Sequence, residues 1–345
     1  MHKFGWIGWL SAALFSSGLL LAQVPEIPFD SAPNLLKLPA GLYLGEAAGV
    51  ATDSKGNLFV YTRTGEGATM GGSRFFTHGG SRLFEFDPAG KYVREIGSGI
   101  YGFLFAQAVR VDAHDNIWTV DRGADVVIEF DPAGRYVMAF GRKPESVNPS
   151  GGRGGGRGRG VPGQGIAGDT FNRPTDVAWD AAGDIFVSDA YTNARVVKLD
   201  RNGKFLKTWG SKGSGEGQFE MPNSLAVDAH GNVYVADLGN RRIQVFDNEG
   251  NFKSQIGDVG APWALCISPG PHQYLFSSNS NPPDSMDNGE VYKMELDGKI
   301  LGRFGTAGKL TKQFGTVNEI DCRNPNVLYV GELTNWRVQK LTLHP

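Results

Sequence analysis

The chain has 345 residues and a formal net charge of -2 at pH 7, which is close to balance. A charge this small gives no reason to expect nucleic acid or an anionic membrane as a partner. Glycine is abundant, with 49 residues, and aromatic residues make up 11% of the chain. This composition suits many short strands joined by tight turns, and it argues against a helical protein.

The N-terminal segment, residues 1–22, is predicted to be a cleavable signal peptide. Lys3 supplies a weak positive charge, an apolar stretch follows, and Ala22 offers a cleavage site. The alternative is a transmembrane anchor, but glycine and serine dilute the apolar run, and the run is short for a bilayer span. We therefore expect a secreted or periplasmic mature chain, residues 23–345, without stable membrane insertion.

One pattern recurs along the rest of the chain. An apolar strand leads to Asp and a turn, a second strand ends in Asp, and a third and a fourth strand follow before a closing Gly. The clearest repeat runs from Leu225 to Gly257. Excluding one insertion, the closing glycines recur about every 44–48 residues. Four short strands at this period are typical of a propeller blade.

Six such repeats follow one another in the chain. The predicted blades span residues 49–97, 109–141, 176–210, 225–257, 263–305 and 318 to the C-terminus. The last has three strands, so its fourth strand is expected from residues 35–44, which removes the open sheet edges. A solenoid is the alternative, but it needs capping repeats, and the sequence has none. We predict an all-β, six-bladed propeller with four antiparallel strands per blade, forming a single domain.

The two cysteines, Cys266 and Cys322, exclude a metal site of the Cys-rich kind. The alignment of the repeats places them on two innermost strands at positions of opposite parity in the alternation of side chains along each strand. We therefore expect two buried free thiols in preference to a disulfide.

Loop length distinguishes the two faces of the predicted ring. The turns between strands 1 and 2, and between strands 3 and 4, are short. The other connections carry the insertions at 63–81, 142–173 and 279–289. Because long loops on a rigid frame often carry specificity, we expect the binding site on their face, at the mouth of the central channel. The Gly/Arg run at 151–160 is interpreted as a flexible basic lid or tether, not an RNA-binding segment.

Two strings in the third blade are more specific than the general repeat. They are Pro174-Thr175-Asp176-Val177-Ala178 and Ser188-Asp189-Ala190-Tyr191-Thr192-Asn193-Ala194-Arg195. Together with Val235-Ala236-Asp237 and Arg242-Ile243-Gln244, they resemble the catalytic core of peptidyl-α-hydroxyglycine α-amidating lyase, a propeller of NHL-type repeats. The similarity is strongest over residues 171–246.

The resemblance implies a zinc ion held on the channel axis by three histidines, one at the start of the innermost strand in each of three blades. The corresponding positions here are Gln107, Asn223 and Asn318. An amide side chain presents a neutral oxygen and cannot replace imidazole in such a zinc site. Of the six histidines, only His78 is expected on the loop face. We therefore expect no tri-His zinc site.

Other positions that the resemblance implies to be functional are kept. Tyr191 matches a tyrosine that acts on the substrate hydroxyl, and Arg63 and Arg242 match arginines suited to a substrate carboxylate. The alternatives are that Tyr191 packs at the channel mouth and that Arg242 belongs to the general repeat signature. Glu319 stands where the family has a calcium-ligating aspartate, which leaves calcium as a candidate cofactor.

Without the resemblance, the predicted channel mouth is a polar ring with little charge. Its positions are Ala48, Gln107, Thr175, Asn223, Trp263 and Asn318, and Asp176 and Glu319 stand next to two of them. This ring suits hydrogen bonding to a peptide, glycan or small molecule, with Trp263 as a stacking face. Our first hypothesis is a monomeric ligand-binding propeller that keeps the lyase frame without its metal. The alternative is a divergent lyase or hydrolase that uses Tyr191, Arg63 and Arg242, or a calcium site of oxygen ligands.

Overall fold

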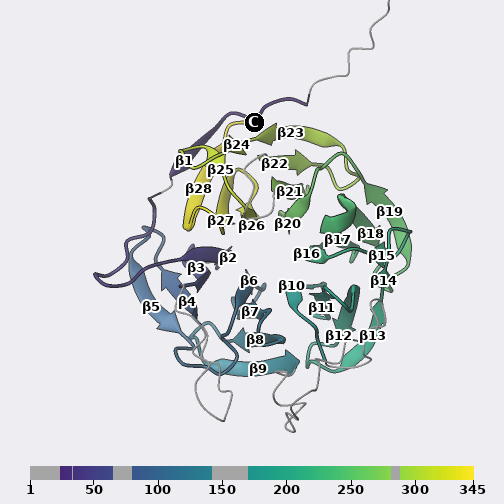
Figure 1. Cartoon of the computed structure of the whole chain (residues 1–345), viewed down its shortest axis with the longest axis horizontal. Helices are drawn as coiled ribbons and strands as arrows, with labels where there is room; N and C mark the ends of the chain where they lie inside the picture. Colours follow the sequence, from purple (N-terminus) through teal and green to yellow (C-terminus); the bar gives the residue numbers. More distant parts are fainter. Residues whose placement is uncertain (1–23, 33, 65–79, 142–169, 281–287) are drawn as a thin grey trace, which may run out of the picture.

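Six four-stranded antiparallel sheets surround a central axis in the computed structural model (Figure 1). The structure describes residues 24–32, 34–64, 80–141, 170–280 and 288–345. The predicted signal peptide, His78 and the Gly/Arg run at 151–160 lie outside these residues. The predicted six-bladed, all-β propeller is confirmed, since the helical residues of the described part form a single 3₁₀ turn, Leu238–Asn240. No helix in the described part is long and apolar enough to cross a membrane.

Blades 1 to 5 run outward from the axis in chain order. Blade 1 contains β2 (Glu46–Thr52), β3 (Leu58–Arg63), β4 (Ser81–Phe86) and β5 (Tyr92–Ile96). Blade 2 contains β6 (Ala106–Val111), β7 (Ile117–Asp121), β8 (Val126–Phe130) and β9 (Tyr136–Gly141). Blade 3 contains β10 (Pro174–Trp179), β11 (Ile185–Asp189), β12 (Arg195–Leu199) and β13 (Phe205–Trp209).

Blades 4 and 5 follow the same order, and blade 6 takes its outer strand from the N-terminal segment. Blade 4 contains β16 (Pro222–Val227), β17 (Val233–Asp237), β18 (Arg242–Phe246) and β19 (Phe252–Ile256). Blade 5 contains β20 (Pro262–Ile267), β21 (Leu275–Ser280), β22 (Gly289–Met294) and β23 (Ile300–Phe304). Blade 6 contains β26 (Val317–Asn324), β27 (Val327–Glu332) and β28 (Arg337–Leu343), with β1 (Phe29–Ala32) as its outer strand. Two short parallel ribbons precede blades 4 and 6: β14 (Ser211–Lys212) with β15 (Gln218–Phe219), and β24 (Thr306–Ala307) with β25 (Gln313–Phe314).

An N-terminal strand closes the ring, as predicted. The prediction that residues 35–44 form this strand was wrong. β1 pairs antiparallel with β28, with Phe29 opposite Leu343. Phe29 is buried beside the rings of Phe304 and Phe314, which anchors this strand. Residues 35–44 instead pack their leucines against the core of blade 1. Their apolar residues do not alternate strictly, and Pro39 has no backbone N–H, so this segment is a poor ladder strand.

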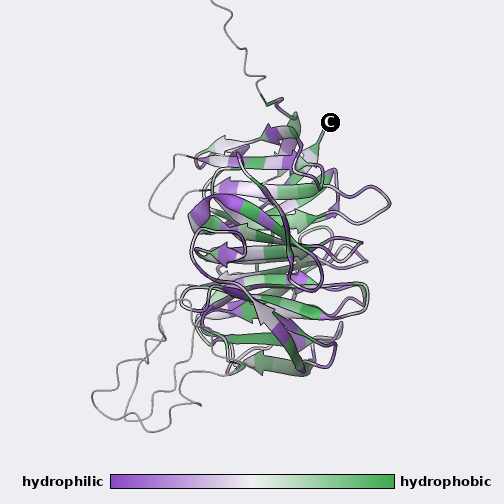
Figure 2. Cartoon of the chain, turned by 90° about the vertical axis from the view of Figure 1, so that its right-hand side faces the viewer, coloured by the Kyte–Doolittle hydropathy of each residue, from purple (hydrophilic) through white to green (hydrophobic). Residues whose placement is uncertain are grey.

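The hydrophobic core lies between neighbouring blades. The second strand β17 is buried along its whole length, whereas the outer strand β13 alternates between half-buried and exposed residues. One core cluster joins Phe186 of blade 3 to Phe219 and Phe246. Seen edge-on, hydrophobic residues concentrate in the strands and hydrophilic residues in the described loops (Figure 2). Because both faces of each sheet are packed, the frame that carries the loops is rigid.

The expectation of two free thiols was wrong, because Cys266 and Cys322 form a disulfide with a Cα–Cα distance of 6.0 Å. Cys266 belongs to β20 and Cys322 to β26, the innermost strands of two adjacent blades. Neighbouring blades face each other with opposite sides of their sheets. Opposite parity therefore points the two side chains toward each other. The bond links blades 5 and 6 near the axis.

Candidate functional site

Each innermost strand begins with a β-bulge, where its pairing with the next strand slips by one residue. Bulges re-aim side chains and are frequent next to functional sites. The residues at these slips are the ones expected at the channel mouth: Ala48, Gln107, Thr175, Asn223, Trp263 and Asn318. The repeat therefore places one such residue from every blade at an equivalent position around the axis.

The amide of Asn318 connects three blades. Its Nδ2 donates to the backbone oxygen of Ala48 at 2.6 Å and to that of Gln107 at 2.8 Å. The Gln107 side chain lies beside it, with its Nε2 donating to Asn318 Oδ1 at 3.5 Å. Both side chains are almost fully buried. These amides therefore tie blade 6 to blades 1 and 2.

On the other side of the ring, Asn223 and Thr175 also join neighbouring blades through hydrogen bonds to backbone oxygens. Asn223 Nδ2 donates to the backbone oxygen of Trp263 at 2.7 Å, and Thr175 Oγ1 donates to that of Pro222 at 2.8 Å. The indole of Trp263 is half-buried and packs against the core cluster that contains Ala48. The polar ring is thus engaged in joining neighbouring blades.

This donor set does not fit the zinc ion that the resemblance implies. At two of the three positions, Asn318 and Asn223, the amide N–H groups are committed to backbone carbonyls. At the third, Gln107 Oε1 accepts a hydrogen bond from Arg63 Nη2 at 3.2 Å. Zinc in proteins takes imidazole, thiolate or carboxylate ligands. The described residues contain no group of three or more His, Cys, Asp or Glu side chains arranged to hold a metal ion.

Arg63 lies at the end of β3, where it faces the next blade. Its Nε donates to the backbone oxygen of Ala106 at 2.7 Å, and its Nη1 pairs with Glu46 at 2.9 Å. The guanidinium also stacks 4.0 Å from the centroid of the Phe105 ring. Its position is therefore fixed by blades 1 and 2 together.

Two further arginines continue this stack toward Tyr191, and the sequence reasoning missed both. Arg122 lies 4.8 Å from the Phe105 centroid and 5.4 Å from that of Tyr191. Arg173 lies 4.5 Å from the Tyr191 centroid on the same network. Among the described residues, neither guanidinium has an ion-pair partner. We call these five residues, Arg63, Phe105, Arg122, Tyr191 and Arg173, the arginine–aromatic cluster.

Burial and charge both act on this cluster. Partial burial lowers the pKa of Arg122, and the neighbouring positive charge of Arg173 lowers it further. Tyr191 and Arg173 both have left-handed backbone conformations, with φ of 53° and 60°. Non-glycine residues adopt this conformation rarely, and they do so mostly where function or tight packing requires it. Among the residues that the structure describes, the cluster carries the positive charges of Arg122 and Arg173 without an ion-pair partner.

A buried carboxylate holds the loops that form the cluster. Asp121 accepts hydrogen bonds from the backbone N–H groups of Leu104, Phe105 and Ala124 at 2.8, 2.8 and 2.7 Å. The hydroxyl of Tyr61 donates to it at 2.8 Å. Asp121 also accepts from the backbone N–H of Gly123, next to Arg122, at 3.0 Å. This one side chain therefore holds the backbone on both sides of the Phe105–Arg122 contact.

Arg242 makes its described contacts elsewhere. Its guanidinium pairs with Asp237 at 2.9 Å and donates to the backbone oxygens of Gly215 and Gln218 at 2.7 and 2.9 Å. Arg337 makes the same set of bonds in blade 6, with Glu332 at 2.7 Å and Gln313 O at 2.8 Å. The structure thus brings Tyr191 and Arg63 into one cluster, while Arg242 braces the ribbon that precedes blade 4.

Asp176 and Glu319 lie inside the ring, where they meet Arg110. Arg110 pairs with Asp176 at 2.5 Å and with Glu319 at 2.9 Å. The second oxygen of Glu319 accepts from the backbone N–H groups of Val50 and Val109. Burial raises the pKa of Glu319 well above its usual value. The residues do not fit a calcium ion, because the guanidinium already supplies the positive charge between these carboxyl groups.

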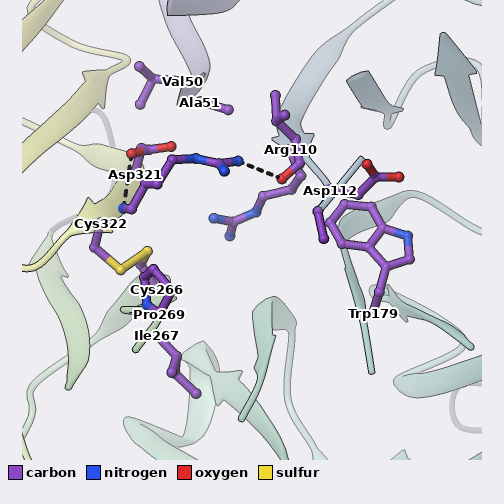
Figure 3. Close-up of a pocket in the computed structure, with 13 residues that line it drawn as sticks. Val50, Ala51, Arg110, Asp112, Trp179, Cys266, Ile267, Pro269, Asp321 and Cys322 are labelled. Carbon is purple, nitrogen blue, oxygen red and sulfur yellow. Dashed lines mark hydrogen bonds between the residues drawn. A yellow bond between two sulfur atoms is a disulfide. The ribbon is translucent and has the colours of Figure 1, made fainter. Parts of the chain in front are cut away.

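A cavity of about 280 Å³ opens at the other end of the axis, where the innermost strands finish. Its lining includes Trp179 on one side and the Cys266–Cys322 disulfide on the other (Figure 3). Asp112, Asp321 and Arg323 add charged groups. This cavity lies on the face of the short turns, away from the bulges. The insertions at 65–79, 142–169 and 281–287, on the face expected to bind, lie outside the described residues.

Comparison with known proteins confirms the repeat and the resemblance. Residues 219–246 match the NHL repeat family. The chain is 28% identical over 345 residues to mouse (Mus musculus) peptidyl-glycine alpha-amidating monooxygenase, covering 92% of this chain and 33% of the relative. It is 26% identical over 375 residues to peptidyl-alpha-hydroxyglycine alpha-amidating lyase 1 of Drosophila melanogaster, covering 94% of this chain and 64% of the relative. The chain therefore spans about a third of the length of the monooxygenases that it matches.

Solved structures agree on the fold. The structure of a streptogramin B lyase aligns with a TM-score of 0.53 at 13% identity, covering 92% of this chain and 98% of that one. A gluconolactonase from Xanthomonas campestris aligns with a TM-score of 0.56 at 18% identity, covering 94% of this chain and 99% of that one. At these identities the likeness concerns the propeller architecture alone.

Proposed function

We propose that this six-bladed NHL-repeat propeller, related to the peptide-amidating enzymes, binds the terminal carboxylate of a peptide or small polar ligand at the arginine–aromatic cluster. One observation carries the proposal. Arg122 and Arg173 both stack on Tyr191, and neither has an ion-pair partner among the described residues. An anionic ligand would supply the partner that the described residues do not provide.

The chemistry of the cluster favours a carboxylate. Arg63 is neutralised by Glu46, so the excess positive charge belongs to Arg122 and Arg173. A guanidinium offers two parallel N–H donors that match the two oxygens of a carboxylate. The Tyr191 ring restricts both side chains, which lowers the entropy lost when a ligand is held. The relatives are named for peptidyl-glycine and peptidyl-alpha-hydroxyglycine, which supports a peptide C-terminus as the ligand.

Binding without zinc catalysis is the function that these residues favour. The amides at the three positions where the resemblance implies histidine hydrogen-bond to neighbouring blades and to Arg63. They stabilise the ring around the site. The propeller frame would then present the carboxylate site without the metal chemistry of the relatives.

A divergent enzyme is the second candidate, and Asp125 is the observation that favours it. Its Oδ1 accepts a hydrogen bond from the backbone N–H of Arg173 at 2.7 Å. Burial raises the pKa of Asp125 to about 7. A carboxyl group that exchanges a proton near neutral pH, next to the cluster, is suited to general acid–base chemistry.

The test compares a short peptide that ends in a free carboxylate with the same peptide ending in an amide, by calorimetric titration. We expect the carboxylate to bind at least about tenfold more tightly, and Arg122→Gln and Arg173→Gln each to weaken it by about tenfold or more, as for the loss of a charged hydrogen bond. Arg135→Gln is the matched control, because that side chain is 81% exposed on the opposite face. Equal binding of both peptides, or unchanged binding by both variants, would contradict the proposal.

The second candidate has its own readout. An α-hydroxyglycine peptide is incubated with the protein and glyoxylate release is measured. Turnover that is lost in Asp125→Asn, while peptide binding stays intact, would establish catalysis. Binding without turnover leaves the first function standing alone.

We also place the protein in an oxidising compartment, secreted or periplasmic, and expect it to be a monomer. The Cys266–Cys322 disulfide supports this location, because cytosolic thiols are normally kept reduced. Cell fractionation, together with the N-terminal mass of the mature chain, tests it. A mature chain that begins at Gln23 is the expected result.

A further inference from the structure

The side chain of Arg110 connects β6 to the innermost strands of four other blades. Its Nε donates to Asp176 Oδ1 of blade 3 at 2.9 Å. Its Nη2 donates to Ser224 Oγ of blade 4 at 3.3 Å and to Leu265 O of blade 5 at 3.1 Å. Its Nη1 donates to Ile320 O of blade 6 at 3.3 Å. Every partner atom is an oxygen.

The same guanidinium reaches the remaining blade through Glu319. Its Nε lies 2.9 Å from Glu319 Oε1, and the other oxygen of that carboxyl group accepts from the backbone N–H of Val50 in blade 1 at 3.2 Å. Glu319 also accepts from Val109 N in blade 2 at 3.0 Å. Arg110 and Glu319 together therefore contact all six blades.

The surroundings of Arg110 would be unfavourable without a positive charge. Asp176 and Glu319 are 2% and 1% exposed, and both face the guanidinium. Two carboxyl groups at this depth cannot both ionise unless a cation lies between them. Asp176 also accepts from the Ser224 hydroxyl and from Leu225 N, so its orientation toward the axis is fixed.

The oxygens around the guanidinium are of the kind that hard divalent cations prefer. Carboxylates, backbone carbonyls and a hydroxyl are typical ligands of Ca²⁺, which takes six to eight oxygens. Here the carboxylates come from Asp176 and Glu319, the carbonyls from Leu265 and Ile320, and the hydroxyl from Ser224. A guanidinium donates five N–H groups from a single charged plane, so its charge and its donors can take the place of an ion in this cage. Glu319 Oε1 is held by the ion pair with Arg110 and accepts no hydrogen bond among the described residues.

We propose that the Arg110 guanidinium is the permanent cation at the centre of this propeller, and that it occupies an oxygen cage which would otherwise require a hard divalent cation. The ring is then held together from within by its own side chain. Its stability is independent of zinc and calcium. Removal of the guanidinium exposes a latent divalent-cation site between Asp176 and Glu319.

The first arm of the test uses the unmodified protein. Its metal content is measured by elemental analysis, and its Tm is measured with excess EDTA and with excess Ca²⁺. We expect no stoichiometric metal and the same Tm in both solutions. Stoichiometric calcium, or a Tm that falls on chelation, would overturn the proposal.

The second arm replaces the guanidinium. Arg110→Ala is expected to lower the Tm by roughly 5–10 °C in EDTA, as when one partner of a buried ion pair is removed. Excess Ca²⁺ is expected to restore part of this loss, with one Ca²⁺ bound per chain by titration calorimetry. Arg110→Ala combined with Glu319→Gln is the matched control, and it should lose the response to Ca²⁺. An Arg110→Ala protein that is as stable as the parent, or that ignores Ca²⁺, would contradict the cage.

Arg110→Lys covers the case in which Arg110→Ala does not fold. Lysine keeps the charge but has fewer donors, so we expect a folded protein with a lowered Tm and no response to Ca²⁺. A Lys variant whose Tm rises with Ca²⁺ would show that charge at this position is not what excludes the ion.

Discussion

At the scale of single residues, Asp121 shows how one buried carboxylate builds a surface site. It lies at the end of β7, and its oxygens hold the N–H groups of Leu104 and Phe105. Burial raises its pKa, while the hydrogen bonds from Tyr61 and the backbone oppose that shift. The half-buried arginine–aromatic cluster therefore depends on a side chain that no ligand would touch.

Tyr61→Phe tests this dependence. The substitution removes the hydroxyl that donates to Asp121 at 2.8 Å and leaves the ring in place. Because the remaining donors still hold the carboxylate, we expect the free energy of unfolding to fall by about 1–2 kcal/mol, measured by urea denaturation. Tyr136→Phe, on a side chain with 58% exposure, is the control and should change nothing measurable. Equal stability of the two variants would show that Asp121 does not need this donor.

The sequence predicted part of the cluster and missed the rest for a physical reason. Tyr191 and Arg63 were singled out because they match family positions at the ends of strands. Arg122 and Arg173 are single charges in loops, and no spacing marks them. Arg122 meets Tyr191 because the ring brings blades 2 and 3 side by side. Arg173 meets it because β10, which follows Arg173, pairs with β11, which precedes Tyr191. Arg110 was missed likewise, since an arginine within an apolar strand shows its role only when its partners are known.

At the scale of secondary-structure elements, the disulfide shows that a sequence repeat predicts the position of a residue within its blade but not its contacts with the next blade. The repeat placed Cys266 and Cys322 on innermost strands at opposite parity, and both placements hold. The error lay in the relation between two blades, because the parity rule for neighbours within one sheet does not apply across two facing sheets. The partner of the closing strand, β28, was predicted correctly, but the strand was placed at residues 35–44 and lies at β1 instead, where Phe29 packs beside Phe304 and Phe314.

Loss of the disulfide should weaken the contact between blades 5 and 6. We expect Cys266→Ser combined with Cys322→Ser to lower the free energy of unfolding by about 2–4 kcal/mol, since the bond spans 56 residues of chain. Reductant should destabilise the parent protein by a similar amount and leave the double variant unchanged, which is the control. A parent protein that is insensitive to reductant during urea denaturation would contradict this.

At the scale of the whole molecule, stability should depend on pH in a direction set by buried carboxyl groups. Burial raises the pKa of Glu129 to about 7, and the charge of Asp112 adds to this. Its usual value is 4.5, so between pH 4.5 and about 7 the folded state holds a proton that the unfolded state has released. Stability therefore falls as the pH rises through this window.

Glu129→Gln isolates this contribution. The variant should be more stable than the parent above pH 7, by about 1 kcal/mol after allowance for solvent screening, and the difference should vanish toward pH 4. Urea denaturation from pH 4 to pH 8 measures both profiles. Glu249→Gln, at an exposed glutamate, is the control. Parallel pH profiles for parent and Glu129→Gln would contradict the assignment.

The pairing of β1 with β28 has a consequence for how the chain can be rearranged. The first and last strands of the ring lie hydrogen-bonded in one sheet, with Phe29 opposite Leu343. A short linker joining these neighbours would therefore let new termini be opened in a turn between any two strands of another blade. Such circular permutants would keep every blade and every contact of Arg110. The order in which the blades are synthesised is thus separable from the order in which they stand around the axis.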